Sequence, residues 1–171
     1  KSTKSFRVNS DESYPISSEF EKIKINFDEK FNEYKKQGFQ NIIPDSWIWS
    51  NLGKLKEFSL YGPRYSSKDY VKSGYSVLRT SDINKSGKVN FKNSPKLQLS
   101  DLEFQKYCCN VDDILFTRTG SLGTLAVFND NVKSIPSAYL IQYRLKKIVK
   151  NSSWYIFYFF KSPLGQKSLI R

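Results

Sequence analysis

Residues 117–124 carry the side chains best suited to binding a polar surface. Arg118 offers a cationic fork of N–H donors, and three hydroxyl residues lie beside it: Thr117, Thr119 and Ser121. Phosphate oxygens and base edges accept hydrogen bonds from such groups, and no carboxylate in the segment competes for them. We therefore predict a contact with nucleic acid. An ordinary β-hairpin with a solvated tip is the alternative, since its loop prefers the same residues.

Other polar groups are candidates for the same contacts: Arg79 with Thr80 and Ser81, then Arg64 with Tyr65 and Lys68, and finally Ser137 with Tyr139. For Arg79, a salt bridge to Asp82 is an alternative to a DNA contact. For the two tyrosines, packing in the core is the commoner fate of an aromatic side chain. The sequence therefore proposes a set of binding residues whose members have different competing roles.

No pattern supports catalysis by the chain itself. The sequence has no His, so Cys109 lacks a visible base and zinc binding is not expected. The triplet Asp28-Glu29-Lys30 superficially matches the Asp/Glu-x-Lys element of metal-dependent nucleases. That chemistry needs the triplet at a strand end, whereas here it lies in a predicted amphipathic helix. We expect a non-catalytic protein without a metal or cofactor, and a metal-dependent nuclease is the enzymatic alternative.

The positive charge lies on one part of the chain. Residues 1–46 contain 8 Lys/Arg and 8 Asp/Glu, whereas residues 47–171 contain 20 and 8, so the second part carries the entire net charge of +12. Such an excess is typical of proteins that neutralise phosphates. The lysines are scattered rather than gathered beside an amphipathic anchor, which favours nucleic acid over a membrane.

Length and composition predict one globular domain. The chain of 171 residues is 39% apolar and 16% aromatic, which suits a sheet-rich core. Its longest apolar run, residues 154–160, is far below the roughly 20 residues that span a bilayer. We expect a cytoplasmic protein, and adjacent Cys108 and Cys109 argue against a secreted disulfide framework. The absence of Met suggests a piece of a longer polypeptide.

The first 42 residues are predicted to form a separate segment. Apolar side chains recur with helical spacing over residues 20–34, with a capping pair at Ser18 and Glu21 and a glycine stop at Gly38. A helix is expected at about 19–37, preceded by an irregular arm over residues 1–17. The basic domain is then predicted to occupy residues 43–171.

Within the basic domain, strands come first and helices close the chain. Strands are predicted at 47–49, 75–78, 114–116, 125–128 and 138–145, with a short one at 88–91 and a polar loop over 61–74. A helix over 100–107 has Ser100 and Glu103 as its cap. Two more helices are predicted at 154–161 and 164–171, separated by Pro163.

Three blocks of sequence carry a family resemblance: residues 43–49 with Leu52-Gly53, residues 74–83, and residues 111–123. In this order they resemble a target recognition domain of the specificity subunits of type I restriction-modification systems. The resemblance covers about residues 43–170. The stretch 155–166 is similar to the helix that closes such domains.

The resemblance implies an α+β fold with a twisted, mainly antiparallel sheet and flanking helices. It implies sequence-specific reading of one half of a bipartite site in double-stranded DNA. Methylation and cleavage would belong to methyltransferase (M) and endonuclease (R) subunits, which would use S-adenosylmethionine, ATP and Mg. The chain holds one such domain, whereas a complete family subunit holds two separated by long helices. The recognition region of a fused restriction-methylation enzyme is one alternative, and a protein-interaction module using residues 154–160 is another.

Overall fold

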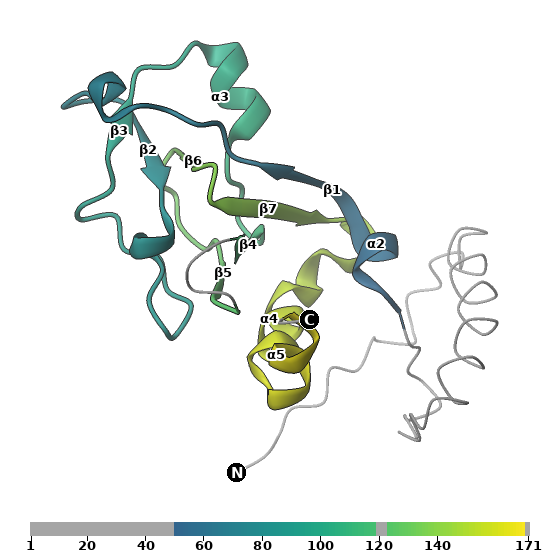
Figure 1. The fold of residues 1–171 in the computed structure, drawn as a ribbon. Coiled ribbons are helices and arrows are strands. Elements are labelled where there is room, and N and C mark those ends of the chain that lie inside the picture. The colour runs from purple at the N-terminus through teal and green to yellow at the C-terminus, as the bar shows by residue number, and fades with distance from the viewer. Residues whose placement is uncertain (1–49, 119–122, 170–171) are drawn as a thin grey trace. The chain divides into compact units, whose positions relative to one another are not determined.

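The computed structural model describes residues 50–118 and 123–169 (Figure 1). The chain divides into two compact units, residues 1–54 and 55–171, and the second contains nearly all of the described residues. The expected arm at 1–17, the helix at 19–37, the strand at 47–49 and the boundary at 43 all lie outside the described residues.

Seven strands and several short helices make up the described chain between residues 52 and 169. The strands are β1 (Lys56–Tyr61), β2 (Tyr75–Leu78), β3 (Lys96–Leu97), β4 (Ile114–Thr117), β5 (Leu125–Val127), β6 (Ser134–Pro136) and β7 (Leu140–Leu145). The α-helices are α2 (Leu52–Leu55), α3 (Asp101–Tyr107), α4 (Ser153–Lys161) and α5 (Pro163–Leu169). Three 3₁₀ segments complete the list: η1 (Ser67–Asp69), η2 (Thr80–Asp82) and η3 (Lys147–Ser152).

The strands form two sheets. A four-stranded antiparallel sheet has the order β1-β7-β4-β5, and a three-stranded sheet has the order β3-β2-β6, in which β2 and β6 are parallel. The expected α+β class with mainly antiparallel pairing is confirmed. The sequence predicts a single sheet, whereas the structure has two, because β6 pairs with β2 rather than with its neighbours in sequence.

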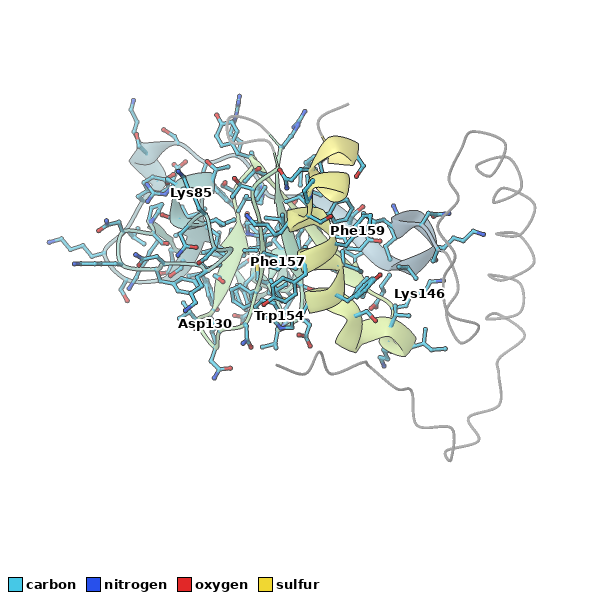
Figure 2. All side chains as sticks on the ribbon, turned by 90° about the horizontal axis from the view of Figure 1, so that it is seen from below. Lys85, Asp130, Lys146, Trp154, Phe157 and Phe159 are labelled. Atoms are coloured by element: carbon cyan, nitrogen blue, oxygen red, sulfur yellow. The ribbon has the colours of Figure 1, made fainter. Side chains whose placement is uncertain are left out.

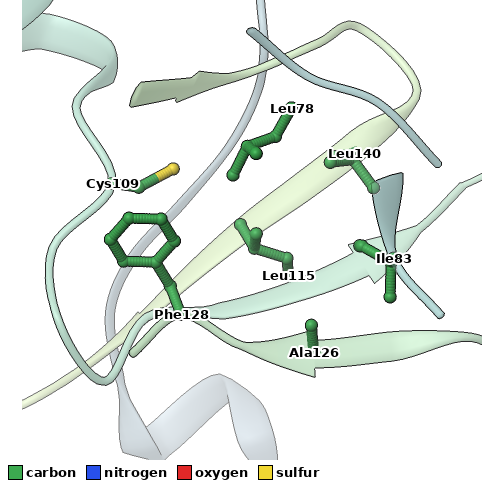
Figure 3. Close-up of a cluster of buried hydrophobic side chains, with 7 residues drawn as sticks. All are labelled: Leu78, Ile83, Cys109, Leu115, Ala126, Phe128 and Leu140. Carbon is green, nitrogen blue, oxygen red and sulfur yellow. The ribbon is translucent and has the colours of Figure 1, made fainter. Parts of the chain in front are cut away.

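The core lies between the two sheets and is apolar. Leu115 of β4 and Leu140 of β7 face Leu78 of β2, with Phe128 and Cys109 in the same cluster (Figure 3). Neighbouring strand residues point to opposite faces, so Phe116 points away from this cluster and meets Phe160 of α4 in an edge-to-face contact with centroids 5.6 Å apart. The four-stranded sheet is therefore covered on both faces.

Helix α4 covers the sheet with one face and exposes the other. Ile156, Phe157 and Phe160 are buried, whereas Tyr158 is exposed. Trp154 lies beside Phe157 on the helix, as Figure 2 shows, with ring centroids 5.6 Å apart. Part of the apolar stretch 154–160 thus covers the sheet, whereas Trp154, Tyr155 and Tyr158 are exposed. Pro163 opens α5, a position where its missing N–H costs nothing.

Local patterns predicted several elements well. The strand at 75–78 is β2, the two strands at 114–116 and 125–128 pair as antiparallel β4 and β5, and Ser100 caps α3 by accepting a hydrogen bond from the Glu103 amide. The expected strand at 88–91 is wrong: this stretch makes only an isolated bridge between Ile83 and Val89. The expected loop at 61 begins one residue too early, because Tyr61 is the last residue of β1.

Candidate nucleic-acid interface

Strand directions bring several of the proposed residues to one end of the two sheets. Because β7 is antiparallel to β1 and β4, its first residues lie beside the last residues of those strands, with Tyr61 opposite Ile141 and Thr117 opposite Leu140. Since β2 and β6 are parallel, the residues that follow them also leave at a common end. The Ser137 amide, just after β6, donates to the Leu78 carbonyl at 2.8 Å.

The turn after β1 connects the two sheets at this end. Gly62 lies so close to β6 that an added Cβ would come within 1.9 Å of the Pro136 carbonyl oxygen and 2.4 Å of the Ser137 carbonyl oxygen. Only glycine allows this approach. Arg64, which is exposed, follows two residues later and therefore leaves from the same region.

Arg118 is exposed and follows β4 directly. Its amide donates to the Tyr139 carbonyl at 2.9 Å, and its guanidinium carbon lies 4.7 Å from the centroid of the Tyr61 ring. Both tyrosines are about half exposed, Tyr61 at 53% and Tyr139 at 49%. Arg118, the Tyr61 ring beneath its guanidinium and the exposed Tyr139, whose backbone it contacts, therefore lie together at this end, and we call them the Arg118 cluster (Tyr61, Arg118, Tyr139).

The other residues of the predicted loop divide into two groups. Thr117 is buried at the end of β4, and its hydroxyl donates to the Thr124 carbonyl at 2.9 Å, so this side chain closes the hairpin. Thr119 and Ser121 lie outside the described residues. On the return side, the Gln166 amide of α5 donates to the Gly123 carbonyl at 2.9 Å and so ties this hairpin to the last helix.

Arg79 lies after β2 but is engaged within the protein. Its Nη2 contacts Asp82 Oδ1 at 2.9 Å, its Nε donates to Oδ2 at 3.1 Å, and Nη2 also donates to the Asn93 carbonyl. The hydrogen bonds to Asp82 raise the pKa of the guanidinium. The salt bridge considered as the alternative is therefore present. Thr80 and Ser81 form the 3₁₀ turn between the two partners, and Ser81 is exposed.

Tyr65 and Lys68 lie on the loop after β1. The Tyr65 hydroxyl donates to Glu103 Oε1 at 2.6 Å, and its half-buried ring packs on the cluster around Leu97, so the packing alternative holds for this tyrosine. Burial and the Glu103 hydrogen bond raise the pKa of the Tyr65 phenol. Lys68 is exposed within η1. Ser137 is half-buried, and its hydroxyl oxygen has no hydrogen-bond partner among the described residues.

A buried ion pair joins β4 and β7 at the end of these strands opposite the Arg118 cluster. Asp113, 1% exposed and one residue before β4, accepts hydrogen bonds from Arg144 Nε and Nη2, both at 2.7 Å. The Gln142 amide and the Asn110 backbone N–H also donate to it, at 2.6 and 2.7 Å. The hydrogen bonds from Arg144 to Asp113 raise the pKa of the Arg144 guanidinium. The network fixes the two strands whose ends carry Arg118 and Tyr139.

The four arginines in the described residues differ in what they contact. Arg79 and Arg144 each pair with an aspartate, whereas Arg64 and Arg118 have no carboxylate partner among the residues that the structure describes. Exposed cations are found on many elements, and Figure 2 shows nitrogen-tipped side chains projecting in several directions. Among the described arginines, Arg118 at the sheet end is therefore the donor best placed for an external anion or base edge.

The described residues add nothing to the nuclease alternative. They contain no group of three or more His, Cys, Asp or Glu side chains that could hold a metal ion. The triplet Asp28-Glu29-Lys30 lies outside the described residues. Within that part of the chain, no helix has the length and apolar character needed to cross a bilayer.

Sequence reasoning missed two residues of this region. The polar residues after Tyr61 predict a loop that begins at this residue, although the alternation of Phe58 and Leu60 with polar residues is a signal for the strand that Tyr61 ends. Gln166 carried no local signal, because its role comes from a contact with Gly123, which is far away in the sequence.

Comparison with known proteins identifies the fold. No protein-family model and no curated protein matches the sequence. A chain from a structure describing complex assembly and conformational transition of the type I R-M system is similar with a TM-score of 0.56 and 12% identity, covering 89% of this chain and 39% of its own. The HsdS subunit from Thermoanaerobacter tengcongensis is similar with a TM-score of 0.50 and 15% identity, covering 89% and 40%. This chain therefore shares their fold and spans about two fifths of their length.

Proposed function

We propose that this chain is a DNA target recognition domain, which reads one half of a bipartite site as the specificity component of a type I restriction-modification system. The fold that it shares with the HsdS subunit supports this role, as does the concentration of positive charge in residues 47–171. The observation that carries the proposal is Arg118, an exposed guanidinium without a carboxylate partner among the described residues, at the sheet end where several strands terminate.

In this proposal the chain binds and does not catalyse. Arg118, Tyr139 and Arg64 approach the DNA, and Ser81 and Lys68 contact it from the neighbouring loops. Methyl transfer and cleavage belong to M and R subunits in the cytoplasm, which hold S-adenosylmethionine, ATP and Mg. Arg79, Tyr65 and Thr117 contribute by shaping the surface, because each is engaged within the protein.

Binding of the 171-residue chain to duplex DNA, measured by fluorescence anisotropy over a range of salt concentrations, tests the proposal. Log affinity should fall linearly with log salt, with a slope of about −0.9 for each neutralised phosphate. Arg118→Ala should weaken binding to a preferred sequence by about 1 to 3 kcal/mol.

The matched control is Lys147→Ala, which removes an exposed cation just beyond the opposite end of β7. It should change the affinity much less than Arg118→Ala does. A wild-type chain that shows no salt-dependent binding to any duplex, or equal losses in the two variants, would contradict the proposal.

A further inference from the structure

Tyr61 supports the Arg118 guanidinium in a way that a carboxylate could not. The guanidinium carbon lies over the tyrosine ring, 4.7 Å from its centroid. An attraction between a cation and a ring uses the π electrons of the ring and no lone pair. The hydrogen-bonding fork of Arg118 therefore keeps its donors, which a bidentate aspartate such as Asp82 or Asp113 would occupy.

The backbone that carries the Tyr61 ring is itself fixed by the fold. Tyr61 pairs with Ile141 at the end of β1, and the next residue, Gly62, donates a backbone hydrogen bond to the Leu140 carbonyl and packs against the Pro136 carbonyl. The other end of the contact is fixed too, because the Arg118 amide donates to the Tyr139 carbonyl. The Tyr61 ring and the backbone of Arg118 thus both lie at one end of the four-stranded sheet. The ring contact orders the long arginine side chain before binding, so less side-chain freedom is lost when it binds.

The charge and the donor geometry of the Arg118 guanidinium also distinguish possible ligands. A guanidinium held over a neutral ring retains its full charge and a planar set of donors, which matches the O6 and N7 acceptors of guanine. A phosphate can also accept two hydrogen bonds from such a fork, but that contact carries no sequence information, and a lysine can provide it as a point charge. An aromatic ring that supports the guanidinium is therefore most useful for a bidentate contact with a base edge.

We propose, on the basis of the DNA-binding function above, that Tyr61 is a positioning residue for base readout, which holds the Arg118 guanidinium for a bidentate contact with a guanine edge. Tyr61 then influences selectivity at one base pair without contributing charge. It differs in this from the scattered surface lysines, which attract every sequence alike.

The test uses the 171-residue chain and a pool of duplexes with a randomised central segment, from which bound molecules are sequenced. Arg118→Lys keeps the charge and should reduce preference for guanine at one position by about 5- to 150-fold. Tyr61→Leu should reduce the preference at the same position by about two- to fivefold, with an unchanged salt slope. Tyr61→Phe keeps the ring and should restore the preference lost in Tyr61→Leu.

Tyr158→Leu, on α4, is the matched exposed-tyrosine control and should leave the preference unchanged. Urea unfolding of each variant identifies losses that come from misfolding. The inference is overturned if Tyr61→Leu retains the preference, weakens all sequences alike, or is not rescued by Tyr61→Phe. In those cases a wild-type chain that binds DNA selectively still supports the proposed function, whereas a wild-type pool without enrichment would remove that function itself.

Discussion

Replacing Asp113 by Ala should destabilise the basic domain more than any other single loss of charge described above. The carboxylate is 1% exposed and accepts four hydrogen bonds: two from Arg144, one from the Gln142 side chain and one from the Asn110 backbone. The Arg144 side chain is only 22% exposed. Its charge would therefore stay largely out of water without its partner.

The magnitude follows from the burial of both groups. Removing one member of a buried pair typically costs about 3 to 5 kcal/mol, mostly because the remaining charge is uncompensated. Gln142 keeps a second bond, to the Cys108 carbonyl at 2.8 Å, so the loss on its side is partial. A loss of about 3 to 5 kcal/mol is a large part of a total stability of about 5 to 15 kcal/mol, and it corresponds to a fall in Tm of roughly 10 to 20 °C for a domain of this size.

Urea unfolding followed by circular dichroism and tryptophan fluorescence measures the effect. The control is Asp101→Ala, an exposed aspartate in the first turn of α3, which should cost less than about 1 kcal/mol. The double variant Asp113→Ala with Arg144→Met should be no less stable than Asp113→Ala alone, because it removes the uncompensated charge. An Asp113→Ala protein within about 1 kcal/mol of wild type would refute this account of the network.

Three further predictions concern other parts of the domain. At pH 8, Cys109→Ser protein should react with iodoacetamide through half-buried Cys108, whereas Cys108→Ser protein should react only after unfolding. Burial removes the Cys109 thiol from solvent and raises its pKa, so similar reaction rates in the two variants would contradict this prediction. Tyr65→Phe should lower the free energy of unfolding by about 1 kcal/mol, because it removes the hydrogen bond to Glu103. Because the folded-state pKa of this phenol is raised, the wild-type protein should lose stability as pH rises above about 10, and urea midpoints of Tyr65→Phe should fall less steeply over that range. Gly62→Ala would place a methyl carbon 1.9 Å from a carbonyl oxygen of β6, and the free energy of unfolding should fall by about 1 to 3 kcal/mol, which a lower Tm would report. An unchanged Tm would mean that the two sheets are not held this closely.

Elements with strong local patterns could be predicted from the sequence. The hydroxyl of Ser100 caps α3 through the Glu103 amide, which lies three residues away, and the apolar runs around residues 117–124 form a hairpin of sequential strands. Strand β1 was missed because its core-facing residues, Phe58 and Leu60, are only partly buried, and strand β6 because it has three residues and a parallel partner distant in sequence. Short, half-buried strands are defined mainly by their pairing partners.

The amino-acid sequence alone determined the charge of the domain, the position of its arginine-containing hairpin and the absence of His-based chemistry. Only the tertiary structure decided which arginines remain available to a ligand. Arg79 and Arg144 meet aspartates, whereas Arg118 meets the ring of Tyr61, and strand register brings together Arg118 and Tyr61, which lie far apart in sequence. The physical reason is that a guanidinium carries the same charge wherever it stands, while its free donors depend on which acceptors the folded chain places within hydrogen-bonding distance.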